Sequence, residues 1–326
     1  MEKIIDLPPL PVGWDALTAD QMVQLNFIRH EHGQSRENYL FHAFCYLTGI
    51  EIVSSFKDEE GQTLYIFRLR ENIRQKLTMA AWEIQFFISE KLKWLTEECT
   101  RLMDVFPTLI LRGKTFGSPG YAMAGMTYMQ YKKAQDYMVH YHRLTNQLIA
   151  MLDSKDVNEE SAQRLIDERK RAKGSFLAAV YTPETLVHSR MVDGQNVACN
   201  PPEKAYVFST GQISMYSSWF EELPDEKGDC IIQLFSGTML NYRKMFPLLF
   251  PDKEDNRGKT MNFIEVESST MNALQSKLNF NNYQTIYDSN APFILEKLHA
   301  IIKEGKALDE QNRKMKAKRN RFVNVI

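Results

Sequence analysis

The chain has 326 residues, of which 44% are hydrophobic and 25% are charged, and its formal net charge is −1. This composition is typical of a folded globular protein and excludes a disordered one, and the length suits one large core or two packed domains. The balanced charge gives no general attraction to nucleic acid or to an anionic membrane, so we expect neither as a partner.

The first strong structural signal lies near the N-terminus. Thr18 and Gln21 have the spacing of a capping box, in which each side chain accepts a hydrogen bond from the backbone N–H of the other residue. They predict a helix over residues 19–30. Ser35 is expected to cap a second helix, which Gly49 ends.

The next segments change from extended to helical character. Residues 50–56 and 64–69 are rich in β-branched and aromatic side chains and flank a polar turn, which predicts a small hairpin. From residue 73 to residue 102 apolar residues recur every three or four positions, which predicts a helix with one buried stripe. The stripe consists of Ile84, Ile88, Leu92, Leu95, Cys99 and Leu102. Glycine and proline are frequent from Gly113 to Gly120, so this segment is interpreted as a flexible connector.

The second half opens with another capping box. Thr127 and Gln130 repeat the earlier spacing and predict a helix over residues 128–152. A charged surface turn is expected to follow, and then a helix that ends against the core just before Pro183. Residues 184–204 contain a glycine and two adjacent prolines and are interpreted as a long loop. Further helices are expected near residues 206–222, 229–246, 262–277 and 289–318.

These elements together predict a mainly α fold. It consists of two packed helical halves, each begun by a capped helix, with a small β-hairpin near residues 50–69. We place the N-terminal half at residues 1–112, the C-terminal half at residues 113–310, and a basic tail at residues 311–326.

Two Gly-Lys-Thr triplets, at residues 113–115 and 258–260, resemble part of a phosphate-binding loop. Such a loop needs another glycine five positions earlier so that backbone N–H groups can surround the phosphates. Those positions hold Thr108 and Lys253. We therefore predict no nucleotide site at either triplet.

Histidines occur in pairs two residues apart. His140 and His142 are predicted to lie on a helix, where this spacing directs them to different sides. His30 and His32 could share a metal on an extended segment, but no cysteine or carboxylate pattern nearby completes a ligand set. We predict no metal, no cofactor and no catalytic residue.

The four cysteines are far apart in the sequence, which is typical of reduced thiols in a cytosolic protein. Cys199 alone lies near a histidine, His188, and a cysteine nucleophile needs such a base. This pair leaves open an enzymatic alternative that would act through residues 184–204.

The end of the chain is basic. Cations there could contact phosphate, but they also suit the C-terminal end of a helix, where the helix dipole is negative, and we favour this second interpretation. Surface aromatic residues and this tail are the side chains that we expect to contact a partner. They are Tyr121, Trp219, Arg313, Lys314, Lys316, Lys318 and Arg319.

Four segments carry a resemblance to a known group of proteins. They are residues 13–21, residues 113–120 leading into 126–131, residues 176–183 and residues 242–251. In these segments the chain resembles uncharacterised proteins encoded by phages and prophages of Bacteroidetes-type bacteria. The resemblance implies a gene product of the tail or virion-assembly module and implies no catalytic residues.

Three hypotheses about function follow. The leading one is a non-enzymatic phage protein that assists virion assembly as a tail assembly chaperone, with other phage structural proteins as its partners. The alternatives are a virion component, such as a connector or baseplate subunit, and the enzyme described above. We expect the protein in the cytoplasm of the bacterial host or in the virion, because no stretch approaches the roughly 18 apolar residues of a membrane span.

Overall fold

The structure is a computed structural model that describes residues 7, 9–71, 74, 76–153, 158–192, 195–250, 271–277 and 282–323. The chain forms two compact units. The first unit comprises Met1–Phe106 together with Leu223–Thr238, and the second comprises Pro107–Glu222 together with Met239–Ile326. The chain thus passes from the first unit to the second between Phe106 and Pro107, whereas the boundary drawn from the sequence follows residue 112.

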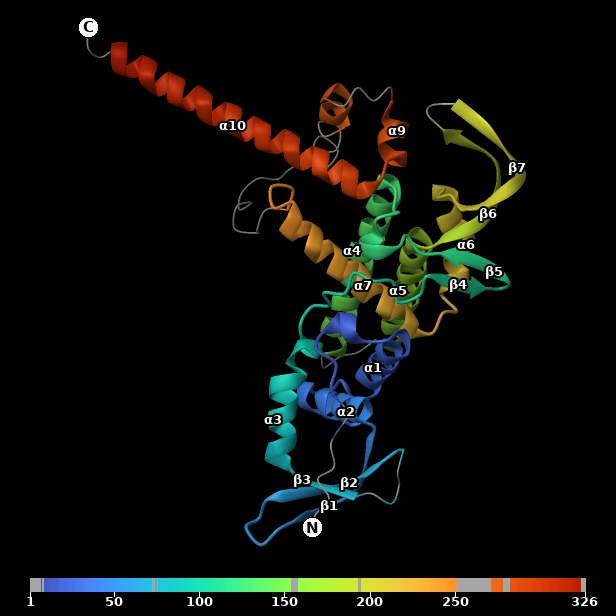
Figure 1. Ribbon diagram of the computed structural model, residues 1–326, viewed down its shortest axis with the longest axis vertical. Helices are drawn as coiled ribbons and strands as arrows, with labels where there is room; N and C mark the ends of the chain where they lie inside the picture. The colour runs from blue at the N-terminus through green and yellow to red at the C-terminus, as the bar shows by residue number, and fades with distance from the viewer. Residues whose placement is uncertain are drawn as a thin grey trace. The chain divides into compact units, whose positions relative to one another are not determined.

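The first unit combines helices with a three-stranded antiparallel sheet in the order β1-β2-β3 (Figure 1). Its elements are η1 (Trp14–Ala16), α1 (Ala19–His32), α2 (Arg36–Thr48), β1 (Ile50–Lys57), β2 (Thr63–Leu69), β3 (Lys76–Ala80), α3 (Ala81–Lys91), η2 (Lys93–Thr96) and most of α7 (Asp225–Met245). Phe44, Phe67, Leu92, Leu95 and Cys230 lie fully buried in its core. The return of α7 to this unit therefore completes a core begun by residues far earlier in the chain.

The local helix signals of the first unit are confirmed. The Thr18 hydroxyl accepts from the N–H of Gln21 at 3.1 Å, and Gln21 Oε1 accepts from the N–H of Thr18 at 2.9 Å. Ser35 caps α2 in the same way through the N–H of Asn38. Gly49 ends α2 with a φ of 69°, a left-handed conformation that glycine adopts without steric cost.

The predicted hairpin near residues 50–69 is also confirmed, because β1 pairs with β2 from Ile50–Leu69 to Lys57–Thr63. The single helix predicted over residues 73–102 is wrong. Lys76–Ala80 pairs with β2 instead, and the helix that follows ends at Lys91. Its apolar stripe remains largely buried, because α3, η2 and the irregular segment after them turn the same residues toward the core.

A buried arginine joins the segment after η2 to the beginning of α1. Arg101 is only 7% exposed. Its Nη1 donates to the carbonyls of Leu17 at 2.7 Å and Trp14 at 3.1 Å, and its Nε donates to that of Met103 at 3.0 Å. Three backbone carbonyls thus bond one guanidinium group inside the first unit.

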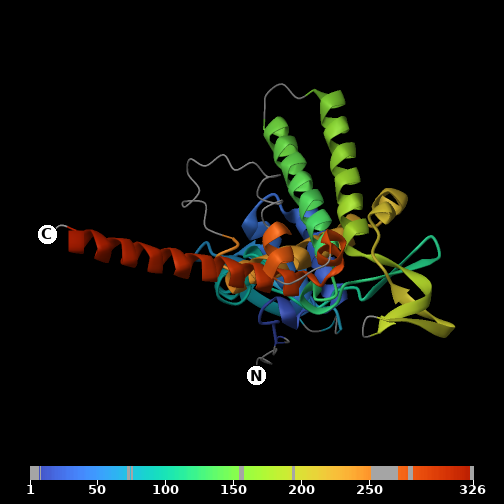
Figure 2. The ribbon, with the colours of Figure 1, turned by 90° about the horizontal axis from the view of Figure 1, so that it is seen from above.

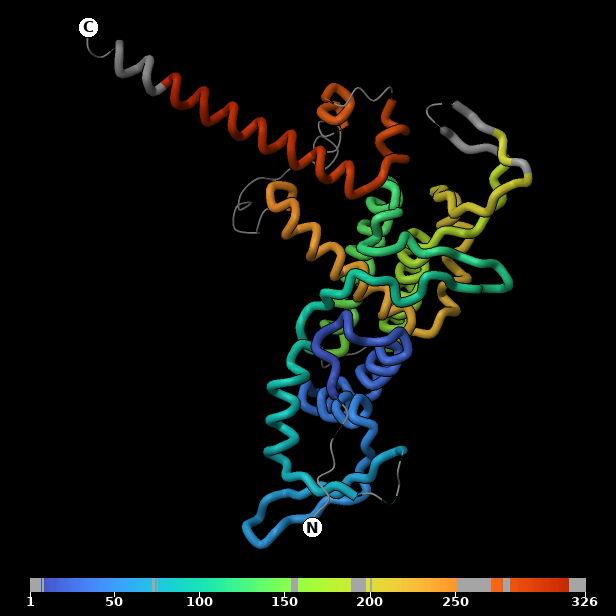
Figure 3. Tube along the Cα trace, viewed as in Figure 1, coloured from blue at the N-terminus to red at the C-terminus, as the bar shows by residue number. Residues whose placement is uncertain are grey.

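The second unit contains a four-stranded antiparallel sheet in the order β4-β5-β6-β7. Its elements are β4 (Thr108–Leu111), β5 (Lys114–Gly117), η3 (Tyr121–Met123), α4 (Tyr128–Leu152), α5 (Glu159–Val180), β6 (Thr182–Val192), β7 (Gln195–Tyr206), α6 (Thr210–Phe220), the end of α7, a helical segment at 271–277, α9 (Tyr283–Asp288) and α10 (Ala291–Val323). The long helices α4 and α5 form a helical hairpin (Figures 2 and 3).

The segment interpreted from the sequence as a connector contains the strand β5, and the segment interpreted as a loop contains most of β6 and β7, so both interpretations are wrong. Arg112 and Gly113 are the two central residues of the β4–β5 turn, with φ values of 47° and 77°. A tight turn with two positive φ values suits the twist of a hairpin, so the glycine shapes a hairpin here. Residues 184–192 and 195–204 belong to β6 and β7, which pair with each other. The adjacent prolines are tolerated because β7 is an edge strand.

Two glutamines at helix-capping positions donate hydrogen bonds to backbone carbonyls at the end of α5. Gln130, the third residue of α4, accepts from the N–H of Thr127 and donates through Nε2 to the carbonyl of Val180 at 2.9 Å. Gln212, in the first turn of α6, donates to the carbonyls of Ala178 at 3.0 Å and Tyr181 at 3.3 Å. The last carbonyls of a helix lack partners within the helix, so both side chains stabilise the buried end of α5.

The two sheets make the protein a mixed α and β structure in which helices predominate. The prediction of a mainly α fold with two packed helical halves is therefore wrong. Near the C-terminus, the helix predicted over residues 289–318 is confirmed as α10, which continues through most of the predicted basic tail, whereas the short helix α9 before it was not predicted. Residues 262–270 of another predicted helix lie outside the described residues, as does the triplet at 258–260.

Candidate functional site

A groove of about 590 Å³ lies between α2 and α3 in the first unit and is the best candidate for a binding site. Its apolar lining comes from three elements. These residues are Leu40 and Phe41 of α2, Tyr65 of β2, and Ala81, Ile84 and Ile88 of α3. Polar and charged residues complete the lining, namely Arg36, Glu37, Asn38, Gln85 and Ser89. The volume and the mixture of apolar surface with a few polar groups are typical of ligand pockets.

The walls of the groove are fixed by short connections to the sheet. Gly49 joins α2 directly to β1, and α3 begins immediately after β3, where Glu83 accepts from the N–H of Ala80 at 2.8 Å. Leu40 and Ile84 are almost fully buried and anchor the two helices. The groove is therefore a consequence of how the sheet holds both helices.

Large apolar side chains are also exposed on α3 and on β1, which pairs with β2. Trp82 and Phe86 lie one turn apart on α3 and are 64% and 58% exposed. Ile52, Val53 and Phe56 are exposed on the edge strand β1. Neighbouring exposed apolar residues, such as Trp82 and Phe86, indicate an interaction surface more strongly than isolated ones do. Burial of each such side chain by a partner would contribute about 1.5–3 kcal/mol.

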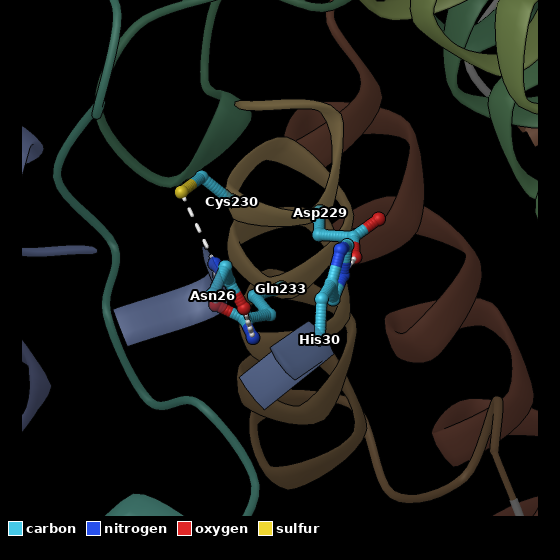
Figure 4. A network of polar contacts seen from close by, with 5 residues as sticks. All are labelled: Asn26, His30, Asp229, Cys230 and Gln233. Atoms are coloured by element: carbon cyan, nitrogen blue, oxygen red, sulfur yellow. Dashed lines mark hydrogen bonds and ion pairs between the residues drawn. The ribbon is translucent and has the colours of Figure 1, made fainter. Parts of the chain in front are cut away.

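A polar network joins α1 to α7 inside the first unit (Figure 4). The amides of Asn26 and Gln233 bond each other in both directions, at 2.8 and 3.2 Å. Asn26 Nδ2 also donates to Cys230 Sγ at 3.2 Å, and His30 Nε2 lies 2.7 Å from the carboxylate of Asp229. Sequence reasoning missed this network because its two halves are about 200 positions apart and neither has a motif of its own.

The network contains a cysteine, a histidine and an aspartate, which also occur together in catalytic sites, but its geometry suits a structural role. The histidine bonds Asp229, while the thiol of Cys230 receives its hydrogen bond from an amide. Burial raises the pKa of the Cys230 thiol to about 12, although the bond from Asn26 acts to lower it. A nucleophilic cysteine requires a lowered pKa, so this residue is held as an inert thiol.

The side chains predicted to contact a partner lie on three elements of the second unit. Tyr121 is exposed on η3. Trp219 of α6 is half-buried, and the guanidinium of Arg112 lies 5.3 Å from the centre of its ring. The basic residues belong to α10. Arg313, Lys314 and Lys316 are exposed there, while the side chains of Lys318 and Arg319 lie outside the part that the structure describes.

The histidines that contact each other in the structure are not the ones that lie two residues apart in the sequence. His32 at the end of α1 stacks on His42 of α2, with 3.6 Å between ring centres. Burial, together with the neighbouring His32, lowers the pKa of His42, which favours the neutral form of that ring. Among the described residues, no group of three or more histidines, cysteines or carboxylates is placed to hold a metal ion.

Cys199 and His188 both lie on the β6–β7 hairpin, close to the irregularity in pairing between Val187 and Ser189. Cys199 is partly exposed, whereas the other three cysteines are buried, and all four are free thiols.

Cysteine accessibility can be tested by alkylation. Burial raises the pKa of Cys45 and Cys230 to about 12 and that of Cys99 to about 11. The thiolate fraction at pH 8 is then about 100- to 1,000-fold below that of an ordinary thiol. We expect iodoacetamide to label Cys199 first in the native protein, as read by peptide mass spectrometry. All four should react in urea, and rapid native labelling of Cys230 would contradict the assigned core.

Within the described residues, no helix is both long and apolar enough to cross a membrane. Comparisons with known protein families, curated proteins and solved structures found no match to this chain. The groove, the exposed surfaces and the sequence resemblance are therefore the observations that bear on function.

Proposed function

We propose that the protein is a non-enzymatic phage or prophage protein that assists virion assembly as a tail assembly chaperone. In this proposal the groove between α2 and α3 binds an apolar segment of another phage structural protein. The phage assignment depends on the sequence resemblance. The binding role is carried by one observation, the apolar groove with a polar rim next to exposed aromatic side chains on α3.

The chemistry of the groove suits a protein segment as its ligand. Phe41, Tyr65 and Ile88 are partly exposed in the lining and offer apolar contact to a ligand. The Phe41 ring lies 5.5 Å from the Tyr65 ring, so the two rings form a neighbouring aromatic pair there. Grooves between two helices commonly accept an amphipathic segment in this way. A client held there would have its aggregation-prone residues shielded from other chains until assembly.

The test uses the tagged full-length chain in infected or induced cells. We expect the wild-type protein to co-purify with a phage structural protein identified by mass spectrometry. Ile88→Glu places a carboxylate in the apolar lining, and we expect it to reduce recovery of that protein at least tenfold, since roughly 1.4 kcal/mol corresponds to tenfold in affinity. Val139→Glu, at an exposed position of α4 in the second unit, is the matched control and should leave recovery unchanged.

Particle composition separates the two assembly roles. A chaperone is released before maturation, so purified particles should lack the chain. Its presence in stoichiometric amounts would identify a virion component instead. Equal recovery with the wild type and with Ile88→Glu would exclude the groove as the binding site.

A further inference from the structure

The second unit carries a different unpartnered surface on the last helix. Helix α10 is held in the unit by its first turns, where Ala291, Ile294, Leu295 and Leu298 are buried. Every residue from Lys303 to Lys316 is exposed. Figure 2 shows this part of α10 extending beyond the other elements of its unit. An exposed helix of this length gains little from packing within the unit and depends on its own weak stabilising contacts.

Those contacts are present but modest. Glu310 and Lys314 form an ion pair one turn apart at 2.6 Å, and Glu304 pairs with Lys277 at 3.1 Å. Exposed pairs of this kind contribute little, and salt screens them. The helix is therefore available for a partner without the loss of a substantial interaction.

One line along this helix is apolar. Ile301, Leu308 and Met315 are spaced by seven residues, and Leu308 and Met315 are 59% and 61% exposed. A spacing of seven keeps side chains on nearly one line of an α-helix, as in the seam of a coiled coil. Burial of this line requires a second helix that lies alongside the first.

Gly305 is a second observation that indicates a partner helix alongside α10. Glycine inside a helix is unfavourable relative to alanine. A Cβ atom built at Gly305 would meet no atom of the chain within 4 Å, so packing within the unit does not require this glycine. Gly305 lies between Ile301 and Leu308 in the heptad pattern, where the absence of a side chain allows a partner helix to approach closely.

The positive charge at the C-terminal end of α10 indicates which kind of partner this helix can bind. Six cations and no acid lie between residues 313 and 321. Two copies in parallel would place these cations beside one another, which is unfavourable. We propose that the exposed part of α10 pairs with a helix of another protein that has apolar residues at heptad spacing and acidic residues beside them. This inference concerns another surface and does not depend on the role of the groove.

The experiment measures binding of the full-length protein to three fluorescent probes by anisotropy. The first is a synthetic helical peptide with leucine at heptad a and d positions and glutamate at e and g positions. The second has glutamine in place of each glutamate, and the third is a DNA duplex. We expect the acidic peptide to bind most tightly and to lose affinity as salt rises, because screening weakens the charge contacts.

Variants decide whether the apolar line is used. The double variant L308Q/M315Q should weaken binding of the acidic peptide by about 100-fold, roughly tenfold for each apolar side chain. Gly305→Ala should also weaken binding while it increases helix content. Lys306→Gln, at an exposed position away from the line, is the control. Circular dichroism verifies that each variant remains folded.

Four results would overturn the proposal. They are unchanged peptide affinity in L308Q/M315Q, no binding of the acidic peptide, tighter binding of DNA that is insensitive to the double variant, and self-association in sedimentation that L308Q/M315Q abolishes. The third result would identify a nucleic-acid surface, and the fourth would identify a second copy as the partner.

Discussion

Replacement of Arg101 by leucine is expected to lower the free energy of unfolding of the first unit by about 3–5 kcal/mol. The guanidinium supplies donors to the carbonyls of Trp14, Leu17 and Met103, and all three bonds are lost together. Leucine avoids the desolvation that a buried cation costs, which offsets part of the loss. Urea unfolding followed by tryptophan fluorescence measures the change, because three of the four tryptophans lie in this unit.

Arg101→Lys tests whether the positive charge or the geometry of the guanidinium donors stabilises the first unit. Lysine keeps the positive charge, but its single ammonium cannot reproduce the planar set of donors. We expect a smaller loss, about 1–3 kcal/mol. Equal stability of the lysine variant and the wild type would mean that charge alone matters, and equal stability of the leucine variant would refute the assigned bonding.

Helix starts could be predicted from the sequence because their causes are local. The residues that cap α1 and α4 lie within one turn of each other, so their spacing is visible in the chain. The ends of α2 and of the β1–β2 hairpin depend similarly on glycine and on a short turn. These elements required no knowledge of distant partners.

The missing strands depend on distant partners. Lys76–Ala80 follows a helical apolar pattern and becomes a strand because β2 offers it an edge. Residues 184–204 contain prolines that suggest a loop, but residues 184–192 and 195–204 belong to β6 and β7, which pair with each other in the second sheet. Tertiary pairing overrode local preference in both cases, as it commonly does for strands.

The candidate site was beyond sequence reasoning for a related reason. The groove exists only after the sheet places α2 beside α3, and no single motif contains residues from both. Trp219 shows a similar limit. The sequence marks it as an aromatic residue that could contact a partner, but it does not show that Trp219 is half-buried with the guanidinium of Arg112 5.3 Å from its ring centre. Exposure of a side chain depends on what packs over it, which spacing does not reveal.

Replacement of Gln130 by glutamate should destabilise the second unit by about 2–4 kcal/mol at neutral pH. The introduced carboxylate can still accept from the N–H of Thr127, so the capping box survives. It cannot donate to the carbonyl of Val180 or to the hydroxyl of Thr182, which Gln130 Nε2 approaches at 2.9 and 3.3 Å. Because Gln130 is only 3% exposed, the variant also buries a charge.

The pH dependence of this variant distinguishes the lost donor from a general packing defect. Burial beside a carbonyl oxygen raises the pKa of the introduced carboxyl above its unfolded value of about 4.3. Its protonated form can donate to Val180, so the destabilisation relative to wild type should be smallest below that pH and should grow as pH rises through the folded pKa. Gln21→Glu is the control, because Gln21 holds the same capping position on α1 at an exposed bond. We expect it to be nearly neutral at every pH. A Gln130→Glu penalty that does not change with pH would show that the Val180 bond is not its source.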